Sequence, residues 1–222
     1  MATLASFFGW RKPSKKELQN TVTLSWGKQR FDVSFKRQNL DLVTLKEFKL
    51  QCKELTGVPV ANMKLTVSGA NLKDDTASLA SCGIQGGSTV ILTGEKVNKQ
   101  AAQQATASGN PEEYALMQRI FKVLDPIKTT MDTDIKAFNT LVQEKKSQES
   151  LSAADKKILY EKGVFLSEKL MQALITLDGV ECSPDFQTAR QHRREGVRLL
   201  QAFLERVDAA RAEAKPLINS QS

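Results

Sequence analysis

The sequence has a single histidine, His192, among its 222 residues, and this scarcity excludes any mechanism that needs two imidazoles. Its three cysteines are odd in number and far apart, and no metal-ligand spacing is present. Aromatic residues make up only 6% of the chain, which is few for a surface that stacks nucleic-acid bases. Nothing marks a nucleophile either, so we expect neither an enzyme nor a bound cofactor.

A long apolar run is also lacking, and the short apolar stretch at the start is followed by basic residues without a signal-peptide layout. We predict that residues 1–20 form a basic, disordered tail. The alternative is weak docking on a membrane or partner, through Leu4, Phe7, Phe8, Trp10, Arg11, Lys12, Lys15 and Lys16. Without a secretory signal, Cys52, Cys82 and Cys182 are expected to be free thiols in a reducing compartment. We expect this compartment to be the cytoplasm, with the nucleus as a second location.

The net charge of +7 is distributed unevenly along the chain. Residues 1–20 contribute +3, whereas residues 112–213 contain sixteen basic and seventeen acidic residues and have a net charge of −1. A nucleic-acid-binding domain is expected to have a broadly basic face. The near-neutral second half therefore argues against that class, although Arg190 to Arg198 form a local basic cluster.

Residues 21–95 begin with the pattern of a β-hairpin. Apolar residues alternate with polar ones over residues 22–24 and again over residues 31–35, with a Trp-Gly-Lys turn between them. Residues 44–55 follow with apolar positions three and four apart, which predicts an amphipathic helix. Gly57 suits the C-cap of this helix, and Pro59 ends it.

The rest of this segment alternates again. We predict a third strand over residues 63–67, a short strand and turn over residues 72–75, a brief turn of helix over residues 79–84, and a final strand that contains Val90 and Leu92. This order resembles ubiquitin, and the local matches are LTGVP after the helix, SGANLKDD after the third strand and SLASCGIQGGSTVIL at the end.

The resemblance to ubiquitin implies a β-grasp fold for residues 21–95 and differs in two functional features. Ubiquitin ends in an exposed Gly-Gly tail that becomes conjugated, whereas here Gly94 continues directly into Glu95, so conjugation is not expected. Thr66 and Thr93 stand where the recognition patch of ubiquitin has an isoleucine and a valine. The recognition patch is thus altered, and binding to the proteasome or to ubiquitin receptors is kept only as an alternative.

Residues 96–110 are rich in Ala, Gln, Ser and Thr, and we predict a linker, although this composition also allows partial helix. Three helices are then expected over residues 111–215. The first begins at Asn110-Pro111 with Glu113 placed to complete a capping box, and Pro126 should kink it. The second starts after Ser152 and stops at Gly179, and the third starts with Ser183 as N-cap. Long helices with short loops predict an antiparallel three-helix bundle.

The second and third of these helices carry the candidate binding residues. Along the second, apolar and acidic residues recur at spacings of 4, 3, 4 and 3 on a face away from its leucines: Val164, Glu168, Met171, Ile175 and Asp178. Ionised acids are rarely buried unpaired, so a contact surface is favoured over packing on the first helix. The third helix adds a basic cluster that contains Arg190, Arg193, Arg194 and Arg198. These cations can also pair with the two acids across the bundle, and that alternative stays open.

Two stretches, ALITLDGV and PDFQTARQHRREGVRLLQAFLERVD, resemble the BAG domain of the co-chaperones that act on heat-shock protein 70. The overall architecture is thus expected to be α+β, a ubiquitin-like domain followed by an all-α BAG three-helix bundle. The resemblance implies a protein without catalysis of its own that binds the nucleotide-binding domain of the chaperone and promotes the release of ADP and substrate. The alternative is an adaptor that links chaperone clients to the ubiquitin–proteasome system through the ubiquitin-like domain.

The resemblance also assigns the contact residues. The main ones are Glu168, Asp178, Arg193, Arg194 and Gln201, with Val164, Met171, Ile175 and Arg190 as additional candidates. Two departures from the family pattern stand in the third helix: Arg194 replaces a lysine, and Glu195-Gly196 puts the glycine one place late.

Overall fold

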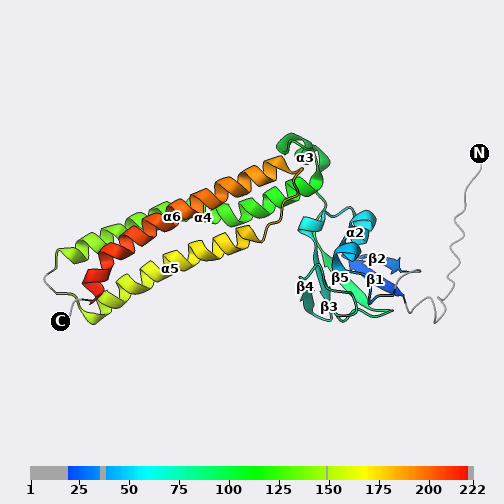
Figure 1. The fold of residues 1–222 in the computed structure, drawn as a ribbon, viewed down its shortest axis with the longest axis horizontal. Helices are drawn as coiled ribbons and strands as arrows, with labels where there is room; N and C mark the ends of the chain where they lie inside the picture. Colours follow the sequence, from blue (N-terminus) through cyan, green and yellow to red (C-terminus); the bar gives the residue numbers. More distant parts are fainter. Residues whose placement is uncertain (1–19, 36–38, 149, 220–222) are drawn as a thin grey trace, which may run out of the picture. The chain divides into compact units, whose positions relative to one another are not determined.

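The computed structural model describes residues 20–35, 39–148 and 150–219 (Figure 1). The tail predicted for residues 1–20, and its alternative as a membrane or partner contact, lies outside the described residues except for Asn20. The chain divides into two compact units, Met1–Val97 and Asn98–Ser222, and each is described by itself.

The first unit is built around a five-stranded sheet in the order β2-β1-β5-β3-β4, in which β1 and β5 are parallel and the other pairs are antiparallel. Its elements are β1 (Thr21–Trp26), β2 (Gln29–Ser34), α2 (Leu45–Thr56), the 3₁₀ helix η1 (Val60–Asn62), β3 (Lys64–Val67), β4 (Ala70–Leu72) and β5 (Thr89–Thr93). Buried residues of α2, such as Phe48 and Cys52, share one core with Leu24, Leu65 and Val90 of the strands. The predicted ubiquitin-like fold is confirmed.

The ends of α2 follow from local chemistry. Thr44 accepts a hydrogen bond from the Glu47 amide while the Glu47 carboxylate accepts one from the Thr44 amide, which completes a capping box. Gly57 ends the helix with φ of 71°, a left-handed conformation that glycine adopts without steric cost. The turn of helix predicted over residues 79–84 is instead a series of hydrogen-bonded turns, closed by the Ile84 amide on the Leu79 carbonyl.

The chain that leaves β5 is held against its own unit. The indole Nε1 of Trp26 donates to the Gly94 carbonyl at 2.9 Å, and Lys96 Nζ lies 5.3 Å from the centroid of the Trp26 ring. A Cβ atom on Gly94 would lie 2.7 Å from the Asn62 carbonyl oxygen, so only glycine fits this close approach. The position that corresponds to the conjugated tail of ubiquitin is therefore packed rather than free.

In its described residues, the second unit contains one short and three long helices: α3 (Lys99–Ala105), α4 (Pro111–Lys146), α5 (Ala153–Asp178) and α6 (Gln187–Asn219). The three long helices lie side by side, successive ones antiparallel, and α4 continues through Pro126 without interruption (Figure 1). The predicted apolar stripes form the core, with Ile120, Ile135, Phe138, Leu170, Leu177, Leu200 and Val207 at most 1% exposed. No helix in the described part of the chain is long and apolar enough to cross a membrane.

The segment predicted as a linker contains α3, which starts after the N-cap residue Asn98 and packs on α4. Ala102 on this helix is fully buried, and Thr106 at its end is nearly so. The helical unit thus begins at Asn98 rather than at residue 111, because the alanines of this segment supply a small apolar face.

Two predicted helix starts need correction. Ser183 does not cap the third helix: residues 183–186 form a turn closed by the Phe186 amide on the Ser183 carbonyl, and α6 begins at Gln187. Glu113 does not complete a capping box either, because Asn110 alone caps α4 through the Glu112 amide. Glu113 is fully buried and accepts hydrogen bonds from the first turn of α6 instead.

Candidate functional site

The face of α5 that carries the predicted contact residues is exposed. Ile175 is 61% exposed and Met171 49%, Glu168 and Asp178 are exposed, and Val164 is half-buried. The opposite face of the helix is buried through Leu159, Leu166, Leu170 and Leu177. The interpretation that this stripe packs on the first helix is therefore wrong, and the stripe is available to a partner.

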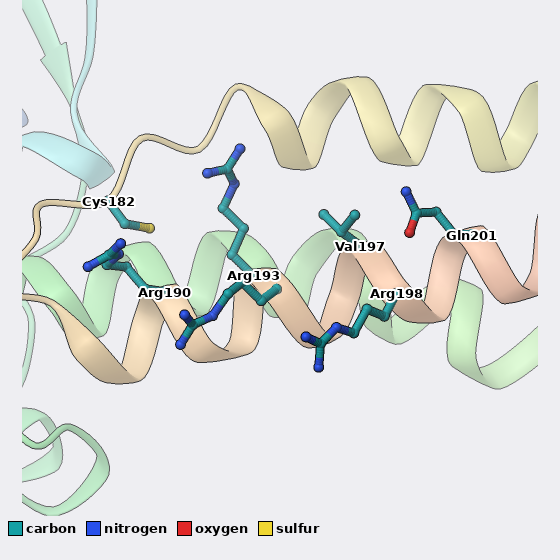
Figure 2. Close-up of a pocket in the computed structure, with 7 residues that line it drawn as sticks. Cys182, Arg190, Arg193, Val197, Arg198 and Gln201 are labelled. Carbon is teal, nitrogen blue, oxygen red and sulfur yellow. The ribbon is translucent and has the colours of Figure 1, made fainter.

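The neighbouring part of α6 lines a surface pocket of about 430 Å³ (Figure 2). Its lining residues are Cys182, Arg190, Arg193, Arg194, Val197, Arg198 and Gln201. Four of these are predicted contact residues, and Arg198 belongs to the basic cluster recognised from the sequence. Cys182 and Val197 were not predicted to lie here. Cys182 belongs to the connection between α5 and α6, whose path no helical periodicity could indicate.

Arg193 links the two helices. As Figure 2 shows, its side chain extends from α6 toward the end of α5. Its Nε donates to the Leu177 carbonyl at 3.2 Å, and its Nη2 donates to the carbonyl of Asp178 at 3.3 Å and to the Asp178 carboxylate at 3.1 Å. Because the last carbonyls of a helix lack partners within it and carry the negative end of its dipole, a guanidinium is well suited to this position.

Pairing across the bundle, between an acid of α5 and an arginine of α6, is thus seen for Asp178 but not for Glu168 in the described part of the chain. Asp178 is paired with Arg193. Glu168 forms no ion pair with any arginine in the part of the chain that the structure describes, and it stands ten residues before Asp178 on the exposed face. Glu168 therefore presents a free carboxylate beside Met171 and Ile175.

Two of the other arginines of the pocket, Arg190 and Arg194, have neutral acceptors. Arg194 Nη2 donates to the Gln191 side-chain oxygen at 2.8 Å, and Arg190 Nη1 donates to the Pro184 carbonyl at 3.4 Å. Neither contact neutralises the guanidinium charge, so the pocket keeps an excess of positive charge next to the acidic and apolar face of α5. The arrangement is a mixed-charge surface with apolar anchors, which is typical of a protein-binding site.

The pocket is poorly suited to catalysis. Burial raises the pKa of the Cys182 thiol, and Arg193 and Arg190 offset only part of this rise, so no activated nucleophile is present there. Within the described residues, no group of three histidine, cysteine or acidic side chains is placed to hold a metal ion. The geometry therefore suits recognition of another protein.

Comparison with known proteins gives matches for both units. Residues 21–96 match the family model described as Ubiquitin family, and residues 120–210 match that of the BAG domain. BAG family molecular chaperone regulator 1A of Schizosaccharomyces pombe is 27% identical over 201 residues, which cover 89% of this chain and 97% of that protein. BAG family molecular chaperone regulator 1 of Rattus norvegicus is 27% identical over 70% of this chain and 41% of its own length. Among solved structures, the crystal structure of ATBAG1 in complex with HSP70 matches 87% of this chain and 98% of its own, with 18% identity and a TM-score of 0.31.

Proposed function

We propose that this chain, which belongs to the BAG family of molecular chaperone regulators and has a ubiquitin-like domain ahead of its BAG domain, is a nucleotide exchange factor for a heat-shock protein 70 chaperone. It binds the nucleotide-binding domain of the chaperone in a conformation with an open cleft, and ADP and substrate are then released faster. It works in the cytoplasm, and also in the nucleus.

The observation that carries this proposal is the exposed face of α5 beside the arginine pocket of α6. Glu168, Met171 and Ile175 are open to a partner on one helix, and Arg190, Arg194 and Gln201 are open on the next. The negative charge on α5 and the positive charges on α6 occupy separate parts of this surface. Such a charge pattern fixes the orientation of a partner more than it adds affinity.

The mechanism follows from differential affinity. A partner shifts a conformational equilibrium only by the factor with which it binds one state better than the other. A rigid pair of helices that fits the open cleft and misfits the closed cleft stabilises the open state, and no covalent step by this chain is needed. Rigidity is supplied here by the Arg193 contacts that tie α6 to the end of α5.

The test is stopped-flow release of a fluorescent ADP analogue from a cytosolic heat-shock protein 70. We expect the full chain to accelerate release, and the variant Glu168→Ala to lose most of this effect. Glu161→Ala is the matched control, because Glu161 is exposed seven residues earlier on α5 and forms an exposed ion pair with Lys157 at 3.7 Å. An unchanged rate of ADP release with the unaltered chain would refute the proposal.

A second candidate function concerns the ubiquitin-like domain. Ile91 on β5 is 52% exposed, and it pairs with Thr66 of β3 on the face of the sheet that does not carry the core. An exposed apolar residue on this face favours a role as adaptor to the proteasome or to ubiquitin receptors. Calorimetric titration of purified proteasomal ubiquitin receptors with the chain and with Ile91→Ala tests it, and equal heats for both proteins would exclude this face as the contact.

A further inference from the structure

The carboxylate of Glu113 lies at the junction of three segments of the helical unit. It stands in the first turn of α4 and is fully buried. Its Oε1 accepts hydrogen bonds from the backbone amides of Thr188 at 2.7 Å and Ala189 at 3.1 Å, in the first turn of α6. Its Oε2 accepts a hydrogen bond from the Ser108 hydroxyl, which precedes α4. One side chain thus connects the start of α4, the turn before it and the start of α6.

This carboxylate acts as the N-cap of a helix to which it does not belong. The first amides of a helix lack partners within it and carry the positive end of its dipole, so an anion is favoured there. Burial tends to raise the pKa of Glu113, but the hydrogen bonds from Ser108, Ala189 and Thr188 outweigh it and hold the pKa below its usual value. Glu113 is therefore ionised at neutral pH, and its charge is directed at α6.

A further hydrogen bond, which does not involve Glu113, strengthens the same junction. The Ala107 amide donates to the Thr188 hydroxyl at 2.9 Å, so the turn before α4 binds α6 independently of Glu113. Together these bonds fix both the position of the first turn of α6 along α4 and its rotation about its own axis.

The arginines of the pocket begin directly after these residues, at Arg190. The Arg190 amide donates to the Phe186 carbonyl at 3.0 Å, and Arg193 follows one turn further with its contacts to Leu177 and Asp178. A rotation or shift of the first turn of α6 would move these guanidiniums relative to Glu168 and Ile175 of α5, because all of them are carried by the same two rigid helices.

We propose that Glu113 is a positioning residue for the chaperone-binding surface: by capping α6 from the start of α4, it sets the placement of Arg190 and Arg193 against the exposed face of α5. The inference rests on the proposed function, since it concerns the surface used there. Glu113 itself is buried and touches no partner, so its effect on binding passes through the arginines.

Three substitutions separate this role from simple stabilisation. Glu113→Ala removes all acceptors of the cluster. Glu113→Gln keeps one oxygen for the amides of Thr188 and Ala189 and places a donor near Ser108, so it restores the geometry without the charge. Ser152→Ala is the matched control, because it removes the N-cap of α5 at the other end of that helix from Asp178.

The experiment uses the full chain and the nucleotide-binding domain of a heat-shock protein 70. The dissociation constant is measured by calorimetry at a temperature at which circular dichroism shows each variant folded. We expect Glu113→Ala to weaken binding about tenfold, and Glu113→Gln and Ser152→Ala each to weaken it by less than about threefold. Hydrogen exchange at the Thr188 and Ala189 amides should be accelerated in Glu113→Ala and only slightly in Glu113→Gln.

The double variant Glu113→Ala/Arg193→Ala decides whether the effect passes through the arginine. We expect it to bind little more weakly than Arg193→Ala alone, because a displaced arginine and an absent one lose the same contact. Two results would overturn the inference and leave the proposed function intact. One is a double variant whose loss of affinity is the product of the two single losses. The other is wild-type affinity of Glu113→Ala despite faster exchange at the Thr188 amide. If Glu113→Ala does not fold, Glu113→Asp replaces it, with the carboxylate one methylene short of α6. Absence of binding by the unaltered chain would overturn the proposed function and this inference together.

Discussion

Arg193 and Asp178 face each other across the bundle, with Nη2 of the arginine 3.1 Å from the carboxylate and Nε 3.2 Å from the Leu177 carbonyl. Two of the five main contact residues assigned by resemblance are thus bound to each other in the free chain. The pair is largely open to solvent, with the Asp178 side chain 68% exposed and that of Arg193 35%. An exposed pair contributes only about 0–1 kcal/mol to stability. A partner can therefore take over the Asp178 carboxylate at little energetic cost, whereas Arg193 is also held by the Leu177 and Asp178 carbonyls.

The first prediction compares the loss of Asp178 with the loss of Arg193. Asp178→Ala removes only the exposed ion pair, so its melting temperature should stay close to that of the unaltered chain. Arg193→Ala also removes the guanidinium bonds to the Leu177 and Asp178 carbonyls, although the Leu177 carbonyl keeps the Val180 amide as a donor, and we expect it to lose about 1 kcal/mol of folding stability. Both should weaken chaperone binding by about 30-fold or more, as for truncation within a desolvated interfacial charge pair. Thermal unfolding beside calorimetric titration checks this. Normal binding by a folded Arg193→Ala would show that the arginine serves only as an internal strut.

Glu168 provides the converse prediction, because it has no ion pair among the described residues and stands on the exposed face. Glu168→Ala should leave the free energy of unfolding within about 0.5 kcal/mol of the original. It should nevertheless reduce chaperone affinity by roughly tenfold or more, since its partner cation would remain buried and unpaired in the complex. Urea unfolding and calorimetry of Glu168→Ala and of the control Glu161→Ala measure both quantities. Equal affinities of the two variants would remove Glu168 from the binding surface.

The elements that could be predicted from the sequence are those fixed by local rules. Alternation predicted the hairpin of β1 and β2, and the spacing of apolar residues predicted the three long helices. The caps formed by Ser152 with Asp155 and by Gly57 also follow from residues close in sequence. The exposed stripe on α5 was recognisable for the same reason, since a helix face is a local property.

The features that could not be predicted depend on residues far apart in the chain. Glu113 satisfies the local rule for a capping box, yet its partner Thr188 is 75 residues away. Only the packing of α4 on α6 decides whether the Glu113 carboxylate binds the Asn110 amide, as in a capping box, or the Thr188 amide of α6. Helical spacing puts Arg193 within the apolar sector of its helix, where a charge needs a partner, but the sequence alone does not tell whether that partner is the end of α5 or another protein.

The helical unit offers a prediction about its own boundary. A fragment that starts at Asn98 keeps α3, the buried Ala102 and the Ser108 and Ala107 bonds to Glu113 and α6. A fragment that starts at Asn110 loses them, and we expect it to be less stable by about 1–3 kcal/mol because Glu113 is left with fewer donors.

Urea unfolding of residues 98–219 and 110–219 measures this difference. We expect the longer fragment to accelerate ADP release as the full chain does, since the proposed contact residues all lie within it. Equal stability of the two fragments would show that α3 is not part of the folded unit. Loss of exchange activity in residues 98–219 would mean that the ubiquitin-like domain takes part in it.

A further prediction concerns Gly94. Its carbonyl accepts the Trp26 indole hydrogen bond, and the chain continues into Glu95, so no free carboxylate is available for transfer to a lysine. We expect that the chain is never conjugated to other proteins through this domain. Mass spectrometry of digested cell extracts checks this by searching for isopeptide-linked remnants that end in Gly94, and their detection would contradict the prediction.

Gly196 lies at a point where α6 packs closely on both α4 and α5. A Cβ atom on this residue would lie 2.6 Å from Leu124 Cδ1 of α4 and 3.0 Å from Leu177 Cδ2 of α5. Replacing glycine by alanine inside a helix normally stabilises by roughly 0.5–1 kcal/mol. Here the added methyl group must displace two buried leucines in a close-packed core, and overpacking of this kind costs about 1–3 kcal/mol. The second effect should prevail.

We therefore expect Gly196→Ala to destabilise residues 98–219 by about 1 kcal/mol or more, as the balance of those two effects. Gly179→Ala is the control, because its Cβ would meet only ordinary contacts, the nearest at 3.5 Å. Urea unfolding followed by far-ultraviolet circular dichroism measures both variants. Gly196→Ala should also weaken chaperone binding, since α6 must move away from α5 at a point between Arg193 and Gln201. A variant that is more stable than the original and binds normally would show that the leucines rearrange freely, and that the close approach at Gly196 does not set the spacing of the two binding helices.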